Sequence, residues 1–155
     1  MTGASDSAEE PFTLAELLAA VELREIITYK VAAERVVNEV ESIEDSIQSM
    51  LGMCRADASL VETRFQMTLE APGITYFVDL GAVFRFERPS ERPLTADVVN
   101  EFMSQVGVMA AFPYLREAVG GLAARMGGEI PVLGLLRRGE VQFQLGAGDG
   151  KRPVE

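Results

Sequence analysis

The chain has 155 residues, a hydrophobic content of 48%, a formal net charge of −10 at pH 7, one cysteine (Cys54) and no histidine. Its acidic character disfavours nucleic-acid binding, and its apolar runs fall short of the ~20 residues that a membrane span needs. We therefore expect a cytoplasmic protein without a disulfide, a metal, a cofactor or membrane insertion.

The two ends of the chain differ in composition from the part between them. Residues 1–11 and 146–155 are small, polar and rich in Gly, Ser and Pro, a composition that does not support a packed core. We expect both ends to be disordered and a single domain to span residues 12–145. This domain begins at Thr13, with Glu16 three residues later, a capping-box pattern that predicts a short apolar helix.

Alternation of apolar and polar residues predicts long strands after this helix. From Val21 to Glu34 the apolar positions share one parity and most charged positions share the other, which predicts a strand with one solvent-exposed face. Residues 61–69 and 76–86 alternate in the same way around the turn sequence APG and predict an antiparallel hairpin. Residues 35–58 are ambiguous between helix and strand, and we assign SIQSMLGMC, residues 46–54, to a strand.

Helical spacing replaces this alternation after the proline-bounded loop ERPSERP. Thr95 is placed to cap a helix that runs to Pro113, where a second helical segment begins and continues to Gly127 and Gly128. A proline inside a helix costs ~3 kcal/mol, and we interpret Pro113 as a bend that lets the helix follow a twisted sheet. Strands followed by helices predict an α+β fold, in which C-terminal helices pack on one face of a long-stranded antiparallel sheet.

The segment around Pro113 resembles the C-terminal signature of the SecB protein-export chaperones. FPYLRE and IPVLGL match that signature at Phe112, Pro113, Tyr114, Arg116, Glu117, Pro131, Leu133 and Leu135. TYFVDLGAVFRF is similar to the family's fourth strand. The resemblance covers about residues 21–136 and implies a SecB-like fold, a dimer of dimers, and outer grooves that hold unfolded polypeptide clients without ATP.

The resemblance also implies site residues. The polypeptide-binding groove would be lined by Leu51, Met53, Val132, Leu135, Leu136 and Phe143. In the export branch, acidic side chains on the exposed sheet face contact the SecA motor, and the matching positions in this chain are Lys30, Glu34 and Phe77. Because one acid remains among these three, we expect SecA docking to be weak. The N-terminal helix is more similar to the branch that pairs with toxin–antitoxin systems, so an antitoxin is the other candidate partner.

Three functions remain open at this stage: a general holdase, a dedicated chaperone that protects one antitoxin, and a small-ligand-binding α+β protein. An enzyme is disfavoured because the sequence has no histidine and no convergent acid pair. We expect Cys54 to be a small buried hydrophobe. Phe112 and Tyr114 are favoured as core or interface residues, and Arg116 and Glu117 as partners of solvated or interface salt bridges.

Overall fold

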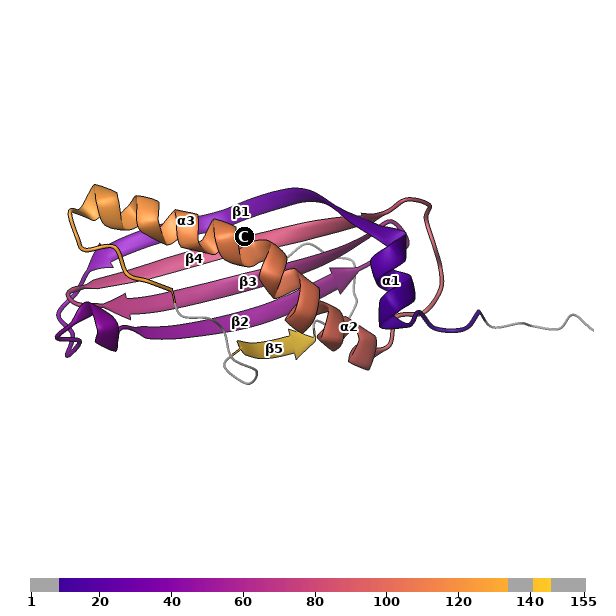
Figure 1. The fold of residues 1–155 in the computed structure, drawn as a ribbon, viewed down its shortest axis with the longest axis horizontal. Helices are drawn as coiled ribbons and strands as arrows, with labels where there is room; N and C mark the ends of the chain where they lie inside the picture. The colour runs from indigo at the N-terminus through magenta and orange to yellow at the C-terminus, as the bar shows by residue number, and fades with distance from the viewer. Residues whose placement is uncertain (1–8, 134–140, 146–155) are drawn as a thin grey trace, which may run out of the picture.

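The computed structural model describes residues 9–133 and 141–145, in which a sheet forms one layer and helices cover one of its faces (Figure 1). The elements in chain order are α1 (Leu14–Ala20), β1 (Val21–Arg35), a short 3-10 turn η1 (Ile43–Asp45), β2 (Ile47–Ala56), β3 (Leu60–Ala71), β4 (Ile74–Phe86), α2 (Ala96–Phe102), a π-helical segment η2 (Met103–Gly107), α3 (Val108–Met126) and β5 (Val141–Leu145). The strand order is β1-β4-β3-β2-β5. The α+β architecture is as expected, and so is the strand assigned to residues 46–54. Residues 1–8 and 146–155 lie outside the described part, so the expectation for the two ends stays a prediction.

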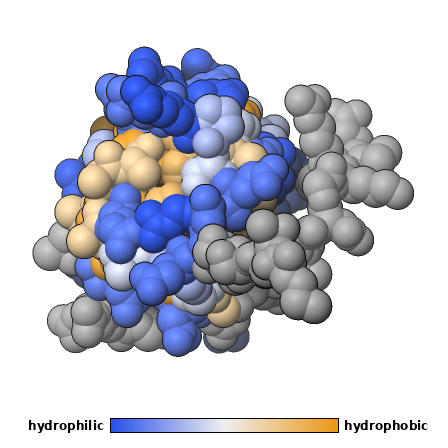
Figure 2. All heavy atoms as spheres, turned by 90° about the vertical axis from the view of Figure 1, so that its right-hand side faces the viewer, coloured by the Kyte–Doolittle hydropathy of each residue, from blue (hydrophilic) through white to orange (hydrophobic). Residues whose placement is uncertain are grey.

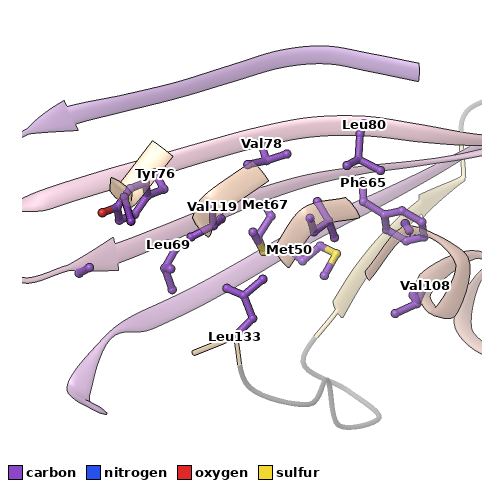
Figure 3. Close-up of a cluster of buried hydrophobic side chains, with 14 of the residues drawn as sticks. Met50, Phe65, Met67, Leu69, Tyr76, Val78, Leu80, Val108, Val119 and Leu133 are labelled. Atoms are coloured by element: carbon purple, nitrogen blue, oxygen red, sulfur yellow. The ribbon is translucent and has the colours of Figure 1, made fainter. Parts of the chain in front are cut away.

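The β3–β4 hairpin forms the centre of the sheet and confirms the predicted alternation. Its strands pair from Leu60 and Arg85 to Ala71 and Ile74, and Gly73 in the turn has a φ of 68°, which favours glycine. Every second residue of both strands faces the helices, and on α3 every fourth residue faces the sheet. Figure 3 labels Phe65, Met67, Leu69, Tyr76, Val78, Leu80 and Val119 among these buried residues. Ala111, Leu115 and Ala123 of α3 are buried in the same cluster. The layer between α3 and the sheet is thus filled by apolar side chains.

Strand β1 pairs with β4 along its whole length, but its expected apolar face is partly wrong. Irregularities between Leu23 and Glu25 and between Thr28 and Lys30 each insert an extra residue opposite β4. An extra residue reverses the side on which the following side chains lie. Tyr29 therefore turns away from the helices, and its side chain donates a hydrogen bond to Glu62 on the other face of the sheet.

A second apolar cluster closes the end of the sheet at α1 and α2. Phe84 of β4 meets Phe102 of α2 edge to face at 4.9 Å between ring centroids, and Phe12 stacks on Phe86 at 5.7 Å. The Thr13 side chain accepts a hydrogen bond from the Glu16 N–H at 3.2 Å, which confirms this half of the predicted cap. At this end of the molecule Figure 2 shows an apolar patch surrounded by hydrophilic residues.

The long helical run over the sheet is interrupted at a different place from the one expected. The irregularity is the π-helical segment η2, and α3 continues through Pro113 without a break. Gly107 at the end of η2 packs so closely on β3 that a Cβ there would lie 2.6 Å from Thr63 Oγ1. The Thr95 cap and the end of α3 at Gly127 (φ 69°) are confirmed.

Pro113 is solvent-exposed within α3. It cannot donate to the carbonyl of Met109, four residues earlier. Because Met109 is also exposed, water can satisfy that carbonyl, which lowers the cost of a proline inside the helix. The run from α2 to α3 curves over the sheet (Figure 1), whereas a bend caused by Pro113 itself stays a prediction.

Candidate functional site

Leu51 and Met53 of β2 lie on the open face, which we define as the sheet face that α2 and α3 do not cover. They pair with Gln66 and Arg64 of β3, whereas their neighbour Met50 pairs with Met67 and is buried on the helix side. Both Leu51 and Met53 are half-buried. The structure therefore brings these two predicted polypeptide-binding residues together on one side of one strand.

The C-terminal segment after α3 has one exposed and one buried apolar residue next to each other. Val132 is 90% exposed, and Leu133 is buried beside Met50 in the cluster between the sheet and α3 (Figure 3). The segment that ends at Leu133 thus reaches the helix side of the sheet, while Leu51 and Met53 lie on the open face. Leu135 and Leu136 lie outside the described residues. A single groove lined by all of these residues stays a prediction.

Strand β5 was not expected from the sequence. It pairs in parallel with β2 over five positions, from Met50 and Val141 to Cys54 and Leu145, and Phe143 pairs with Gly52. The segment VQFQL alternates apolar residues with glutamine, a short strand pattern that could have indicated it. The structure thus places the backbone of Phe143 beside the strand that contains Leu51 and Met53.

The three candidate partner-contact residues share the open face. The Lys30 Nζ atom lies 5.6 Å from the ring centroid of Phe77, within the range of a cation–π contact. Glu34 is exposed four positions further along β1, opposite Thr75. Lys30 and Phe77 are therefore in contact, and Glu34 extends the same surface toward the end of the strand.

A polar network on the open face was missed by the sequence reasoning. Arg64 binds Asp79 through two hydrogen bonds of 2.7 Å, and Gln66 donates to Asp79 at 3.1 Å. Asp79 is only 4% exposed, so this carboxylate is buried with its charge paired. The hydrogen bond with Asp79 raises the pKa of the Arg64 guanidinium. No local pattern could have indicated the network, because its residues come from separate strands.

Tyr29 joins this network to a second carboxylate. Its ring lies under the Arg64 guanidinium, its hydroxyl donates to Glu62, and Arg55 Nε lies 3.4 Å from Glu62 Oε1. Burial, followed by the contact with Glu62, raises the pKa of Tyr29 to about 12. Gly81 leaves the space for this arrangement, since a Cβ there would lie 2.5 Å from Glu62 Oε2. The network thus links side chains of four neighbouring strands, β1 to β4, across the open face.

The signature residues of α3 divide between the core and the solvent. Phe112 is half-buried against the main cluster, while Tyr114, Arg116 and Glu117 are exposed. The Arg116 guanidinium carbon lies 5.0 Å from the ring centroid of Phe112. Pro113 and Tyr114 therefore contribute to the outer surface of α3 and not to the sheet contact.

The described residues offer little support for catalysis. Burial raises the pKa of the Cys54 thiol to about 12, with a further contribution from Glu62, so little of this thiol is present as the nucleophilic thiolate at neutral pH. Within residues 9–133 and 141–145 we find no group of three or more acidic or cysteine side chains that could hold a metal ion. In the same part of the chain, no helix combines the length and hydropathy that a membrane crossing requires. The layer between α3 and the sheet is packed with apolar side chains, and the small-ligand alternative stays a prediction.

Comparison with known proteins identifies the family. No protein-family model matches the chain. The SecB-like chaperone SmegB of Mycolicibacterium smegmatis is 38% identical over 128 residues, which are 83% of this chain and 84% of that protein. The fold is similar to that of the Mycobacterium tuberculosis SecB-like chaperone solved in complex with a ChAD peptide from the HigA1 antitoxin, with a TM-score of 0.65, 20% identity, and coverage of 79% of this chain and 92% of that one. The chain belongs to the SecB-like chaperones.

Proposed function

We propose that this SecB-like chaperone is a holdase that binds non-native polypeptides as extended segments and needs no ATP. The observation that carries the proposal is the similarity to a SecB-like chaperone over most of both chains. The related structure that was solved with an antitoxin peptide supports polypeptide binding by this fold. The cytoplasmic location expected from the composition stays part of the proposal.

The proposed polypeptide-binding surface contains the residues expected from the sequence. Leu51 and Met53 support it because they lie half-buried side by side on β2, and Val132 supports it because its side chain is almost fully exposed. Exposed apolar side chains next to charged ones can hold an unfolded chain without causing self-aggregation. Leu135, Leu136 and Phe143 complete the surface in this proposal.

Aggregation of a protein diluted from denaturant tests the proposal. The parent chain should suppress light scattering at near-stoichiometric amounts, and Val132→Asp or Met53→Gln should require at least threefold more chaperone. The matched control is Val37→Asp, because Val37 is fully exposed and lies outside the proposed surface. A parent chain that leaves aggregation unchanged would contradict the holdase proposal.

A second candidate role is protection of one antitoxin. The related chaperone that binds a ChAD peptide favours this role, and the contact between Lys30 and Phe77 adds a cation to the surface on which the export branch has acids. A dedicated chaperone should bind an antitoxin segment at least tenfold more tightly than unrelated unfolded chains, whereas a general holdase should not discriminate. Fluorescence titration with both kinds of probe separates the two roles.

We also propose that the chain assembles as a homo-oligomer, with a dimer of dimers as the expected form. Strand β1 supports this because it has fifteen residues and is the outer strand of the sheet, and long exposed edge strands tend to pair with another chain. The outer surface of α3 supports it as well. Met109 is 70% exposed there, and a Cβ added at Gly121 would meet no atom within 4 Å.

A further inference from the structure

Strand β5 occupies an edge of the sheet to which another chain could be added. It covers five of the ten residues of β2, namely Met50 to Cys54, and leaves the remaining β2 residues at both ends without a β5 partner. The exposed side chains of Ile47 and Arg55 lie in these uncovered ends. The edge of β2 is therefore longer than the strand that now pairs with it.

The pairing between β2 and β5 differs from the other strand pairings in direction and length, and both differences make it weaker. The other strand pairs among the described residues are antiparallel and extend over ten or more positions, whereas β5 is parallel to β2 and has five residues. Parallel pairing is slightly less stable per residue, and a five-residue strand has few hydrogen bonds to lose. Among the described strands, β5 is the one that can leave at the lowest cost.

The part of β2 under β5 is suited to varied partners. Met53 contributes a half-buried, polarizable side chain there on the open face, and such a side chain adapts to ligands of different shapes. Gly52 has no side chain and pairs with Phe65 on one side and Phe143 on the other. A glycine inside a strand often marks a place where another backbone comes close.

We propose that the β2 edge from Met50 to Cys54 is a β-addition site for extended client segments, and that β5 is a built-in competitor that occupies it between clients. The competitor indicates the chemistry of the ligand: VQFQL is an uncharged pentapeptide in which apolar residues alternate with neutral polar ones. A client segment of this kind displaces β5 and forms the same backbone pairs. This inference rests on the proposed holdase function and identifies where and how the client binds.

The test uses the full chain and a labelled peptide with the sequence of residues 139–147, GEVQFQLGA. In the variant Gln142→Pro/Gln144→Pro, two prolines with a fixed φ and no N–H should prevent β5 from pairing with β2 and so leave the edge free. If β5 is seated in about nine of ten parent chains, the peptide should bind the parent about tenfold more weakly than this variant. The matched control Gln142→Thr/Gln144→Thr keeps both N–H groups and should bind like the parent. Fluorescence anisotropy measures all three affinities.

A disulfide between β2 and β5 would do the opposite of the proline variant, because it would hold β5 on the β2 edge. Cys54 is the single cysteine and pairs with Leu145, and neighbouring strand positions lie within the range that a disulfide can bridge. Oxidised Leu145→Cys should hold β5 in place and lose peptide binding, and reduction should restore it. Equal peptide affinity of the parent and the proline variant, or undiminished binding by the internally cross-linked chain, would overturn the inference.

A further experiment with an unfolded client protein separates this inference from the holdase proposal. An unfolded client should displace the labelled peptide from the proline variant, and this variant should hold clients at lower concentration than the parent. If the peptide affinities differ as expected while client holding is the same in both chains, clients bind elsewhere and the inference is wrong, but the holdase proposal stands. If neither chain holds clients, the holdase proposal fails, while the peptide result still reports on the edge.

Discussion

The guanidinium carbon of Arg64 lies 3.8 Å from the ring centroid of Tyr29, on the face of the sheet opposite the helices. Tyr29 reaches this position because the first irregularity of β1, between Leu23 and Glu25, reverses the side on which the following side chains lie. The Tyr29 hydroxyl in turn donates to Glu62, a carboxylate that is only 4% exposed. One side chain from the edge strand thus covers two charges from the centre of the sheet.

Tyr29→Phe should lower the free energy of unfolding by about 1 kcal/mol, because Glu62 loses a hydrogen-bond donor while it stays buried. Tyr114→Phe is the matched control, since Tyr114 is exposed to the same extent as Tyr29 (43% against 42%) but its hydroxyl has no hydrogen-bond partner among the described residues, so its change should have almost no effect. Urea unfolding followed by circular dichroism measures both. An equal effect of the two substitutions would mean that the Tyr29 hydroxyl is satisfied as well by water as by Glu62.

Cys54 should react slowly with a thiol reagent at pH 8 in the folded chain and quickly after unfolding, because its pKa is raised to about 12 from 9.0. Since the folded pKa is the higher one, the folded state keeps its proton where the unfolded state has lost it. The contribution of Cys54 to stability is therefore complete below pH 9 and decreases as the pH rises toward 12. Urea midpoints of the parent chain should fall over this range more than those of Cys54→Ala. Fast labelling of the folded chain would contradict the burial of this thiol.

Gly107→Ala should destabilise the fold by roughly 1–3 kcal/mol, as overpacking does in a close-packed interior. The added Cβ would lie 2.6 Å from the Thr63 hydroxyl oxygen and 2.9 Å from its methyl carbon, and Thr63 is fully buried. Ser104→Ala, at an exposed position of the same π-helical segment, is the control and should change stability by less than about 0.5 kcal/mol. Thermal unfolding distinguishes the two. A neutral Gly107→Ala would show that α3 can shift away from β3 without loss.

Gly121→Leu should reduce the assembly while it leaves the fold of each chain intact. Within the chain, a side chain at Gly121 meets open space. A smaller assembly in this variant would therefore result from lost contacts between copies of the chain. Light scattering should give a multimer for the parent and a smaller species for this variant, with Ala58→Leu in the exposed turn before β3 as the control. A parent that is monomeric across micromolar concentrations would rule out the proposed oligomer.

The SecA motor from the same cell should bind weakly or undetectably. The sequence resemblance predicts that Lys30 and Phe77 match motor-contacting positions of the export branch, and the loss of two such contacts should weaken binding at least tenfold. Glu34 is the remaining acid of the three and lies exposed on β1. Isothermal titration provides the measurement. Submicromolar binding that Glu34→Ala abolishes would restore the export role.

The sequence predicts those parts of the fold that depend on residues close together in the chain. Alternation in β3 and β4 could be recognised because both strands lie in the centre of the sheet and keep one face on the helices. The face of β1 could not be assigned, because its irregularities depend on pairing with β4, and Arg35 is 39 positions from its partner Ile74. Local periodicity contains no information about such a distant partner.

The site was predicted to a smaller extent for the same reason. Leu51 and Met53 share a parity and were assigned together, but the parallel partner of their strand lies about 90 residues further along the chain. Pro113 indicated an interruption of the helix, whereas the observed π-helical segment lies where Gly107 meets Thr63. The carboxylates Glu62 and Asp79 gave no local signal, because their partners come from other strands.

The position of β1 next to β4 has a consequence for the synthesis of the chain. β1 is the first strand to be made, yet its pairing is complete only after Phe86 has been added, 51 residues after the end of β1 at Arg35. At ordinary rates of translation this takes roughly 3 to 10 s, during which a fifteen-residue strand with apolar side chains lacks a complete partner in its own chain. Until β4 is made, charged residues placed along β1, namely Glu22, Glu25, Lys30 and Glu34, lower the tendency of this unpaired segment to aggregate. The nascent chaperone thus passes through a stage in which it has the same exposed, extended segments as the chains it is proposed to hold.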